Sequence, residues 1–336
     1  MSKQNQILAI VLAVQLVLIA VVFWPRSAAS GAGDQAFFTQ LDQVTSLTIR
    51  DPEGQEIRLR IGRFDPQGGT GWVLPEADDY PCQQERVSKF LDQVAQLKAN
   101  RLVTRTAASH KRLKVSEVDF ERLIALEWAD GTTHKLYLGT SPSYRAMHVR
   151  VDDQDEVYLV SELSVPDAGT GPLTWIDSLY FSVPQEQIVA LALENANGRF
   201  EFARVPEAPG AEGAWTMAGL AADEMLNENN VTSLVSRIAA LRMLRPLGKT
   251  EQESYGIKTP NALITVQTQD QEGKVQTSIL RVGARSEEDQ SYVVISSQSP
   301  YYVNISEYTV KDFVERQRQD FIEQPPTTAP EQDTSS

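Results

Sequence analysis

The sequence is poor in cysteine, with Cys82 as its only one. An intramolecular disulfide bond and a zinc site built from cysteines are therefore excluded. We expect this single thiol to be buried and inert. Two alternatives stay open for it, a nucleophile and a link to another chain.

Basic residues are too few to balance the acidic ones. The chain holds 31 Lys and Arg against 45 Asp and Glu, which gives a formal net charge of −14. Binding to nucleic acid depends on clustered cations, so this charge argues against it. It argues equally against spreading over an anionic lipid surface. The ordinary consequence of such a charge is solubility.

Motifs that carry catalysis are absent. None of the three histidines, His110, His134 and His148, stands in an HExxH pattern, and no serine stands in GxSxG. The acidic residues 152–156 lack the glycine and the distal glutamate of an EF-hand. His134 and His148 fall on neighbouring expected strands, which leaves a metal between them as one alternative. We predict no catalytic, cofactor-binding or metal-binding residue and no enzymatic activity.

Long hydrophobic runs are missing except for one near the start. Residues 7–24 are uncharged, and as a helix they would span about 27 Å, close to the thickness of a bilayer core. We predict a transmembrane anchor in a bacterial inner membrane, with residues 1–6 in the cytoplasm and the body in the periplasm. A cleavable signal peptide is the alternative, because residues 27–30 (SAAS) offer a cleavage site.

The rest of the chain contains one pattern twice. An offset of 144 (191 − 47) places Leu47 on Leu191, and it carries the apolar positions 87, 90, 91, 94 and 97 onto 231, 234, 235, 238 and 241 without a gap. This period is the length of a small domain. We predict a tether at 25–36, tandem repeats at 37–180 and 181–324, and a disordered tail at 325–336.

Each repeat has the pattern of a hairpin, a strand, a helix and a four-stranded meander. Alternation of apolar and polar residues marks the strands, among them 133–138, 147–151 and 157–160, and the helical period marks the helices. The expected helices are 83–100, 228–243 and a closing helix at 310–321, with Asn227 as a cap and Asn197-Gly198 as a hairpin turn. The fold class predicted is α+β, each repeat a mostly antiparallel β-sheet with a packed helix, after the N-terminal transmembrane helix.

Four residues at matching positions are candidates for ligand or partner contacts. Trp72 and Trp215 are expected to pack the sheet onto the helix, and stacking on a carbohydrate is the alternative. Arg101 and Arg245 are expected to stabilise the last carbonyl groups of the helices, and contact with an anion is the alternative.

The strand motifs end on glycine in both halves. Gly139 and Gly283 each close a Leu-x-[Leu/Val]-Gly strand, and we expect a positive φ angle at both. Further motifs are Trp72-Val73-Leu74 before a helix, residues 97–103 (LKANRLV) closing that helix, residues 255–260 (YGIKTP) and residues 157–160 (VYLV).

Together these motifs resemble a bacterial family catalogued as the domain of unknown function "four-three-four-zero", over most of residues 37–324. Residues 112–116 of the first repeat lack the Tyr, Gly and Pro of the second. The resemblance implies an accessory envelope protein beside an ABC-type transport system of the gliding-motility kind, with a membrane protein as partner. It carries no known catalytic residues.

Three functions follow as hypotheses. The first is a single-pass inner-membrane protein whose periplasmic repeats form an interaction or scaffold module for an ABC-type transport complex. The second is a ligand-binding module for a sugar or peptide in the cleft between the repeats, framed by loops 68–71 and 208–213. The third is an unrecognised hydrolase that uses dispersed Asp, Glu and His residues.

Overall fold

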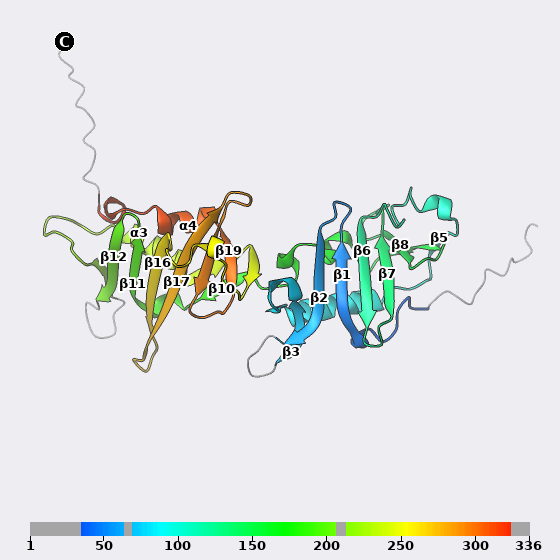
Figure 1. Cartoon of the computed structure of the whole chain (residues 1–336), viewed down its shortest axis with the longest axis horizontal. Helices are drawn as coiled ribbons and strands as arrows, with labels where there is room; N and C mark the ends of the chain where they lie inside the picture. Colours follow the sequence, from blue (N-terminus) through cyan, green and yellow to red (C-terminus); the bar gives the residue numbers. More distant parts are fainter. Residues whose placement is uncertain (1–34, 64–68, 206–212, 324–336) are drawn as a thin grey trace, which may run out of the picture.

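The computed structural model describes residues 35–63, 69–205 and 213–323. These residues form an elongated molecule in which two β-sheets follow one another (Figure 1). Within them, no helix has the length and apolar composition needed to cross a membrane. The predicted anchor at 7–24 and the predicted tail at 325–336 lie outside the described residues.

The first sheet has nine strands in the order β4-β3-β2-β1-β6-β7-β8-β9-β5, and neighbouring strands pair antiparallel. Its strands are β1 (Val44–Arg50), β2 (Glu56–Arg63), β3 (Thr70–Leu74), β4 (Tyr80–Pro81), β5 (Leu102–Thr104), β6 (Arg122–Trp128), β7 (Thr133–Leu138), β8 (Met147–Val151) and β9 (Val157–Val160).

The second sheet has eight strands in the order β13-β12-β11-β16-β17-β18-β19-β15, again with antiparallel neighbours. Its strands are β11 (Ile188–Asn195), β12 (Gly198–Val205), β13 (Ala214–Met217), β15 (Arg245–Gly248), β16 (Ala262–Gln269), β17 (Val275–Ser286), β18 (Ser291–Ser296) and β19 (Tyr302–Ser306). The predicted α+β class with mostly antiparallel sheets is therefore confirmed.

The helices are shorter than the sequence predicts. The α-helices are α2 (Gln84–Ala95), α3 (Glu228–Ala239) and α4 (Glu307–Val314); the 3-10 turns are η1 (Leu41–Gln43), η2 (Pro75–Ala77), η3 (Ala107–Ser109), η4 (Val165–Ala168), η5 (Pro172–Thr174), η6 (Gln185–Gln187), η7 (Glu253–Tyr255) and η8 (Arg318–Phe321). After α2, Leu97 is still fully buried although the helix has ended. Periodicity alone cannot separate a buried helical residue from a buried loop residue, so the predicted end at residue 100 was wrong.

Two local signals are confirmed. Asn227 caps α3, since its side chain accepts a hydrogen bond from Asn230 N at 3.1 Å. Asn195 pairs with Gly198 where β11 turns into β12, and Gly198 has a φ angle of 136°.

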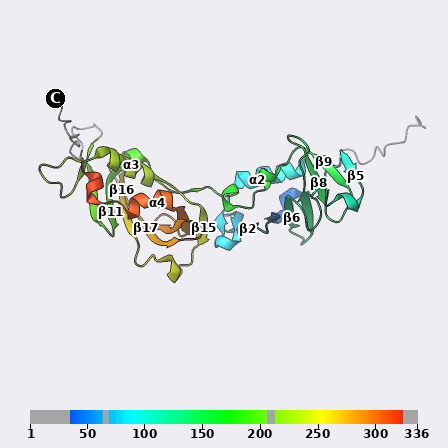
Figure 2. The same cartoon turned by 90° about the horizontal axis from the view of Figure 1, so that it is seen from above.

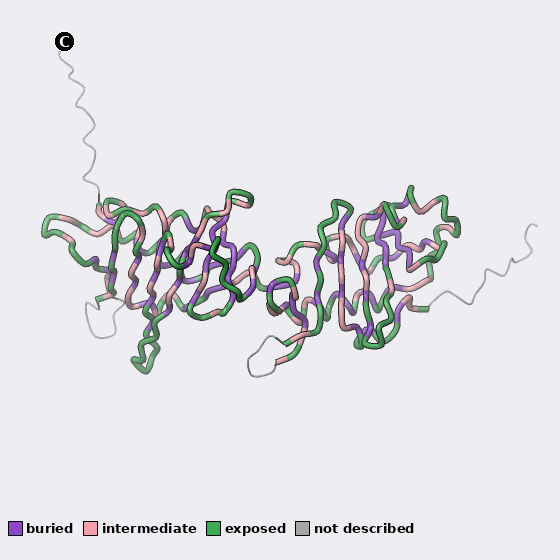
Figure 3. The backbone as a smooth tube through the Cα atoms, in the orientation of Figure 1, coloured by how far each residue is buried: buried purple, intermediate pink, exposed green. Residues whose placement is uncertain are grey.

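One face of each sheet packs on helices to form the core. Phe90 and Val94 of α2 are fully buried against the first sheet, as are Val231 and Ile238 of α3 against the second. Figure 3 shows the buried segments concentrated in the strands. The core residues of both sheets belong to one continuous apolar cluster, which also includes Trp175, Ile176, Tyr180 and Phe181 of the segment that connects them.

The connection between the sheets is itself a strand pair. The strand β10 (Leu179–Ser182) pairs with β14 (Ala240–Arg242), which directly follows α3. The predicted boundary between residues 180 and 181 therefore falls inside β10.

The opposite, outer face of each sheet is half covered by an irregular segment. In the first sheet Leu113 and Val115 pack against Tyr137 and Val157. In the second sheet the segment that contains Tyr255 and Ile257 packs against Val293 and Tyr302. Among the described residues, no comparable apolar cluster covers the other half of either outer face.

Gly139 and Gly283 lie directly under these covering segments. Neither has a positive φ angle, so the expectation of a left-handed conformation was wrong. Their constraint is close approach: a Cβ atom at Gly139 would lie 2.1 Å from the carbonyl oxygen of Leu113, and one at Gly283 would lie 2.0 Å from that of Tyr255. The Leu-x-[Leu/Val]-Gly motif and the YGIKTP motif are therefore in contact with each other.

Candidate functional site

The uncovered part of the outer face of the second sheet is hollowed. Strands β11, β12, β13 and β16 enclose a volume of about 450 Å³ there. Because side chains alternate along a strand, the residues opposite the buried core residues point outward. Here they are small: Ala190 and Ala192 of β11, Ala203 of β12, Thr216 of β13 and Thr265 of β16.

Charged side chains lie at one end of this hollow. Arg199 donates to Glu201 with Nε–Oε1 at 2.7 Å, and its second nitrogen lies 3.3 Å from Glu194. The floor is therefore made of small, mostly apolar side chains, and one rim is a solvated ion-pair cluster.

A hollow of about 450 Å³ also lies on the outer face of the first sheet, over β1, β2 and β6. Its lining is more polar and includes Ser46, Thr48, Arg58 and Glu127. Figure 2 shows α2 and α3 on the same side of their sheets, so both open faces look the same way. The molecule thus presents two hollowed sheet faces along one side.

Trp72 and Trp215 do not belong to an exposed platform. Their exposed fractions are 7% and 6%, and both are part of the core. Trp72 also holds the start of α2, because Gln84 Nε2 donates to its carbonyl oxygen at 3.0 Å. The guanidinium carbon of Arg204 lies over the Trp215 ring, 5.2 Å from its centre. The packing interpretation agrees with these contacts, whereas rings buried this deeply offer no open face for stacking on a sugar.

Arg101 and Arg245 do not lie at helix ends. The helices α2 and α3 end at Ala95 and Ala239, several residues earlier, so the predicted contact with helix carbonyls was wrong. Arg245 instead lies in β15 and pairs with Asp289 at 3.1 Å. Arg101 is exposed at the start of β5.

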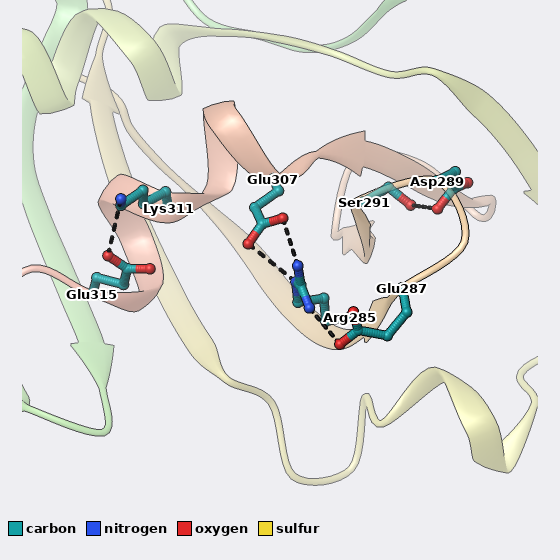
Figure 4. Close-up of polar contacts among 7 residues, drawn as sticks. All are labelled: Arg285, Glu287, Asp289, Ser291, Glu307, Lys311 and Glu315. Carbon is teal, nitrogen blue, oxygen red and sulfur yellow. Dashed lines mark hydrogen bonds and ion pairs between the residues drawn. The ribbon is translucent and has the colours of Figure 1, made fainter.

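Asp289 is the centre of a small polar network beside α4. It accepts hydrogen bonds from Ser291 Oγ at 2.6 Å and from Asn304 Nδ2 at 3.0 Å. Burial raises its pKa, but these bonds and the Arg245 charge outweigh that effect and lower the pKa below its usual value. Figure 4 shows Ser291 turned toward Asp289, with Arg285 between Glu307 and Glu287. Ser291 is fully buried, so its hydroxyl, which bonds to Asp289, is not open to solvent. The ion pairs of Arg285 are partly exposed contacts between neighbouring segments.

The histidines are held apart. The register of β7 and β8 pairs Leu136 with Val151 and Leu138 with Val149, so His134 and His148 lie toward opposite ends of the ladder. His134 Nδ1 lies 2.7 Å from Asp152 Oδ2, and His148 is buried with its pKa lowered by desolvation. A metal shared by the two histidines is therefore excluded by the register.

Cys82 directly follows β4, and its backbone nitrogen donates to Trp72 O of β3 at 2.9 Å. Its side chain is buried, with 7% of the residue exposed, and burial raises its pKa to about 12. At pH 8 almost none of the thiol is then ionised, and the thiolate is the reactive form. We expect a thiol reagent such as a maleimide to modify the folded chain roughly a hundredfold more slowly than the urea-unfolded chain. Equal rates in the two states would show that Cys82 is accessible and reopen a nucleophilic role.

The junction between the sheets is filled by direct contacts. Tyr301 OH donates to Asp79 O at 2.9 Å, and its ring lies 4.7 Å from that of Tyr80. Lys249 N donates to Asp78 Oδ2 at 2.6 Å. Sequence patterns gave no sign of this contact, because its residues are widely separated along the chain.

The described residues of the two loops proposed to frame a cleft lie at different edges of the two sheets. Residues 69–71 enter β3, near the junction-side edge of the first sheet. Gly213 precedes β13, the edge strand of the second sheet that lies opposite β15, and β15 is the edge beside the junction. The remaining parts of both loops lie outside the described residues.

Residues 72–260 match a family model described as Domain of unknown function (DUF4340), which is more than half of the 336 residues. The chain belongs to this family. The family predicted from the motifs is thereby confirmed. The DUF4340 match begins in β3 and ends at Pro260, directly after the segment that covers the outer face of the second sheet. No curated protein and no solved structure matches the chain.

Proposed function

We propose that the chain is a single-pass inner-membrane protein whose periplasmic body is a duplicated interaction module, accessory to an ABC-type transport complex. The observation that carries the interaction role is the pair of open sheet faces, hollowed at matching strands and directed to one side. A sheet that packs on helices through one face only leaves the other face available for a partner.

The strand orders support a duplication. Without β4, the first sheet reads β3-β2-β1-β6-β7-β8-β9-β5, and the second reads β13-β12-β11-β16-β17-β18-β19-β15. Each strand of the second order is the corresponding strand of the first with ten added to its number. A helix then follows, after β4 in the first series and after β13 in the second. Two copies of one fold would place two similar docking faces at a fixed separation.

The open faces support only the interaction role. The membrane anchor and the transport partner are inferred from other observations. The anchor is inferred from the uncharged residues 7–24. The ABC-type partner is inferred from the family resemblance. The open faces do not identify that partner; they indicate where on the body it would bind.

A pair of substitutions in the hollow tests the role of the open face. We expect Ala192→Arg combined with Ala203→Arg to lower recovery of the partner about tenfold or more, because two long cations would fill the floor of the hollow. The measurement is crosslinking of the full chain in intact cells, affinity capture and mass spectrometry, with transporter permease and ATPase subunits as the expected partners.

The matched control is Ala95→Arg, which adds the same side chain at an exposed position of α2. Its recovery of partner should equal that of the unmodified chain. If the unmodified chain captures no transporter subunit, the transport role is wrong. If the hollow variant captures as much as the control, the partner binds elsewhere.

A further inference from the structure

The described part of the chain begins at the β5 end of the first sheet. Ala99 N donates to Gln35 O and Phe37 N donates to Leu97 O, both at 3.0 Å. Figures 1 and 2 both place β5 at the end of the molecule farthest from the second sheet. Whatever precedes Gln35 is therefore attached at this end.

The length of chain before Gln35 limits how far this end can lie from a membrane. Ten residues, 25–34, separate the predicted span at 7–24 from Gln35. Even fully extended, ten residues reach at most about 36 Å. If residues 7–24 cross the bilayer, the β5 end is held within that distance of its surface.

This end carries a cationic stretch in an otherwise acidic protein. Residues 93–116 contain six Lys and Arg and no Asp or Glu, although the whole chain has a net charge of −14. Arg101 and Arg112 are exposed and form no ion pair with any residue that the structure describes, and the same holds for Arg145 in the nearby loop between β7 and β8. The overall charge thus conceals a local surface of opposite sign.

The acidic turn at residues 152–156 lies toward the other end of β5, and Glu121 pairs with Lys114 of the stretch at 2.6 Å. Glu156 is 4.0 Å from Arg105, and Asp152 accepts hydrogen bonds from Lys135 N and interacts with His134. This turn precedes β9 on the side of Thr104, which is where β5 ends. Arg101 precedes β5, so it lies at the end of the strand away from the turn.

Exposed apolar side chains accompany the unpaired cations. Leu102 and Val103 lie on the edge strand β5 with exposed fractions of 41% and 43%. Tyr144 is 89% exposed, with the guanidinium of Arg145 5.5 Å from its ring centre. Apolar and tyrosine side chains flanked by cations are typical of surfaces that lie among lipid headgroups.

We propose that this basic edge, consisting of Arg101, Leu102, Val103, Arg112, Tyr144 and Arg145, rests on the anionic headgroups of the membrane that residues 7–24 enter. The inference rests on the anchor of the proposed function. It orients the molecule, with the first sheet at the bilayer surface and the second sheet held away from it.

A headgroup-contact experiment on the full chain tests this orientation. Val103→Cys reports on the basic edge, and Val275→Cys, at a 52% exposed position of the second sheet, serves as the reference. Each cysteine is labelled with a fluorophore, while Cys82 is buried. The chains are placed in phosphatidylcholine vesicles with or without phosphatidylglycerol, and a headgroup-attached quencher is added. We expect quenching at 103 only in the anionic vesicles and loss of quenching in high salt, with no quenching at 275.

Charge removal gives a second readout. The triple variant Arg101→Gln, Arg112→Gln, Arg145→Gln should weaken headgroup contact roughly a hundredfold, at about fivefold per cation, and so abolish quenching at 103. The matched control Lys258→Gln, Lys274→Gln, Arg281→Gln removes three exposed cations of the second sheet and should change nothing.

Extraction with alkaline carbonate separates the two ways to fail. If the chain stays in the membrane but the label at 103 is no more quenched than the label at 275, the docking inference is wrong and the anchor stands. If carbonate removes the chain from the vesicles, the anchor fails, and the proposed function and the docking inference fall together.

Discussion

The Trp175→Ala variant is expected to lose about 4 kcal/mol of the free energy of unfolding. Trp175 is fully buried, and its ring meets that of Phe90 edge-on at a centroid distance of 5.2 Å. Its indole nitrogen donates to Gly169 O at 2.8 Å. Alanine would leave a cavity and an unpaired carbonyl oxygen, and each of these destabilises a folded protein.

Because of its position, loss of the Trp175 side chain is expected to affect two neighbouring parts of the structure. Its carbonyl oxygen accepts a hydrogen bond from Gln83 N at 2.7 Å, directly before α2. It also lies between β9 and β10, in the segment of the chain that leads from the first sheet to the second, and it belongs to the apolar cluster that includes both cores. We therefore expect the variant to loosen the start of α2 and the connection between the sheets together.

The measurement is urea unfolding of the detergent-solubilised full chain, followed by circular dichroism. Leu173→Ala is the matched control, because Leu173 lies two residues away but is 46% exposed, and its loss should stay below about 1 kcal/mol. Equal losses for the two variants would mean that Trp175 does not organise the connection.

The Gly283→Ala variant is expected to be destabilised by about 3 kcal/mol, although it adds a single methyl group. That methyl would lie 2.0 Å from Tyr255 O and 2.8 Å from Ile257 Cδ1. Backbone cannot move aside cheaply, so the covering segment that contains Tyr255 would have to lift from the sheet.

Hydrogen exchange locates this effect. We expect faster exchange in residues 253–261 of the Gly283→Ala variant, together with a lower urea midpoint. Gly171→Ala is the control, because no heavy atom lies within 4 Å of its Cβ position and its φ angle is negative. A Gly283→Ala chain as stable as the control would show that the close approach is not tight.

Much of the fold could be predicted from local patterns. The strands β7, β8 and β9 begin and end where alternation predicted them, at 133–138, 147–151 and 157–160. Alternation works there because each strand buries one face, or both, under its neighbours, and the residue types record that burial. The cap at Asn227 depends on a local hydrogen bond and the turn at Gly198 on local backbone conformation, so both could also be predicted from the sequence.

The short edge strands could not be predicted. The strands β4, β5, β14 and β15 have two to four residues each. Whether such a short segment forms a strand depends on which strand lies beside it. β5, for example, is a strand because β9 lies beside it, with Leu102 opposite Tyr158.

The candidate site residues also divide into those that local sequence patterns predicted and those that depend on contacts between distant segments. Both tryptophans were correctly expected to pack in the core, whereas both arginines were misplaced, because the helices end before them. The hollow could have been suspected from Ala190 and Ala192, small residues at the outward positions of an apolar strand. The junction around Asp79 and Tyr301 joins residues 222 positions apart and leaves no local signal.

By itself, the sequence determined the α+β class, most of the strands, the cap of α3, the family and an expectation of no catalytic site, because each follows from residue types that are close together in the chain. Only the tertiary structure decided the strand order, the close approach at Gly139 and Gly283, the two open faces and the junction at Tyr301. These features depend on which distant segments touch. Burial of one sheet face is recorded in alternation, but the identity of the segment that covers the other face is not.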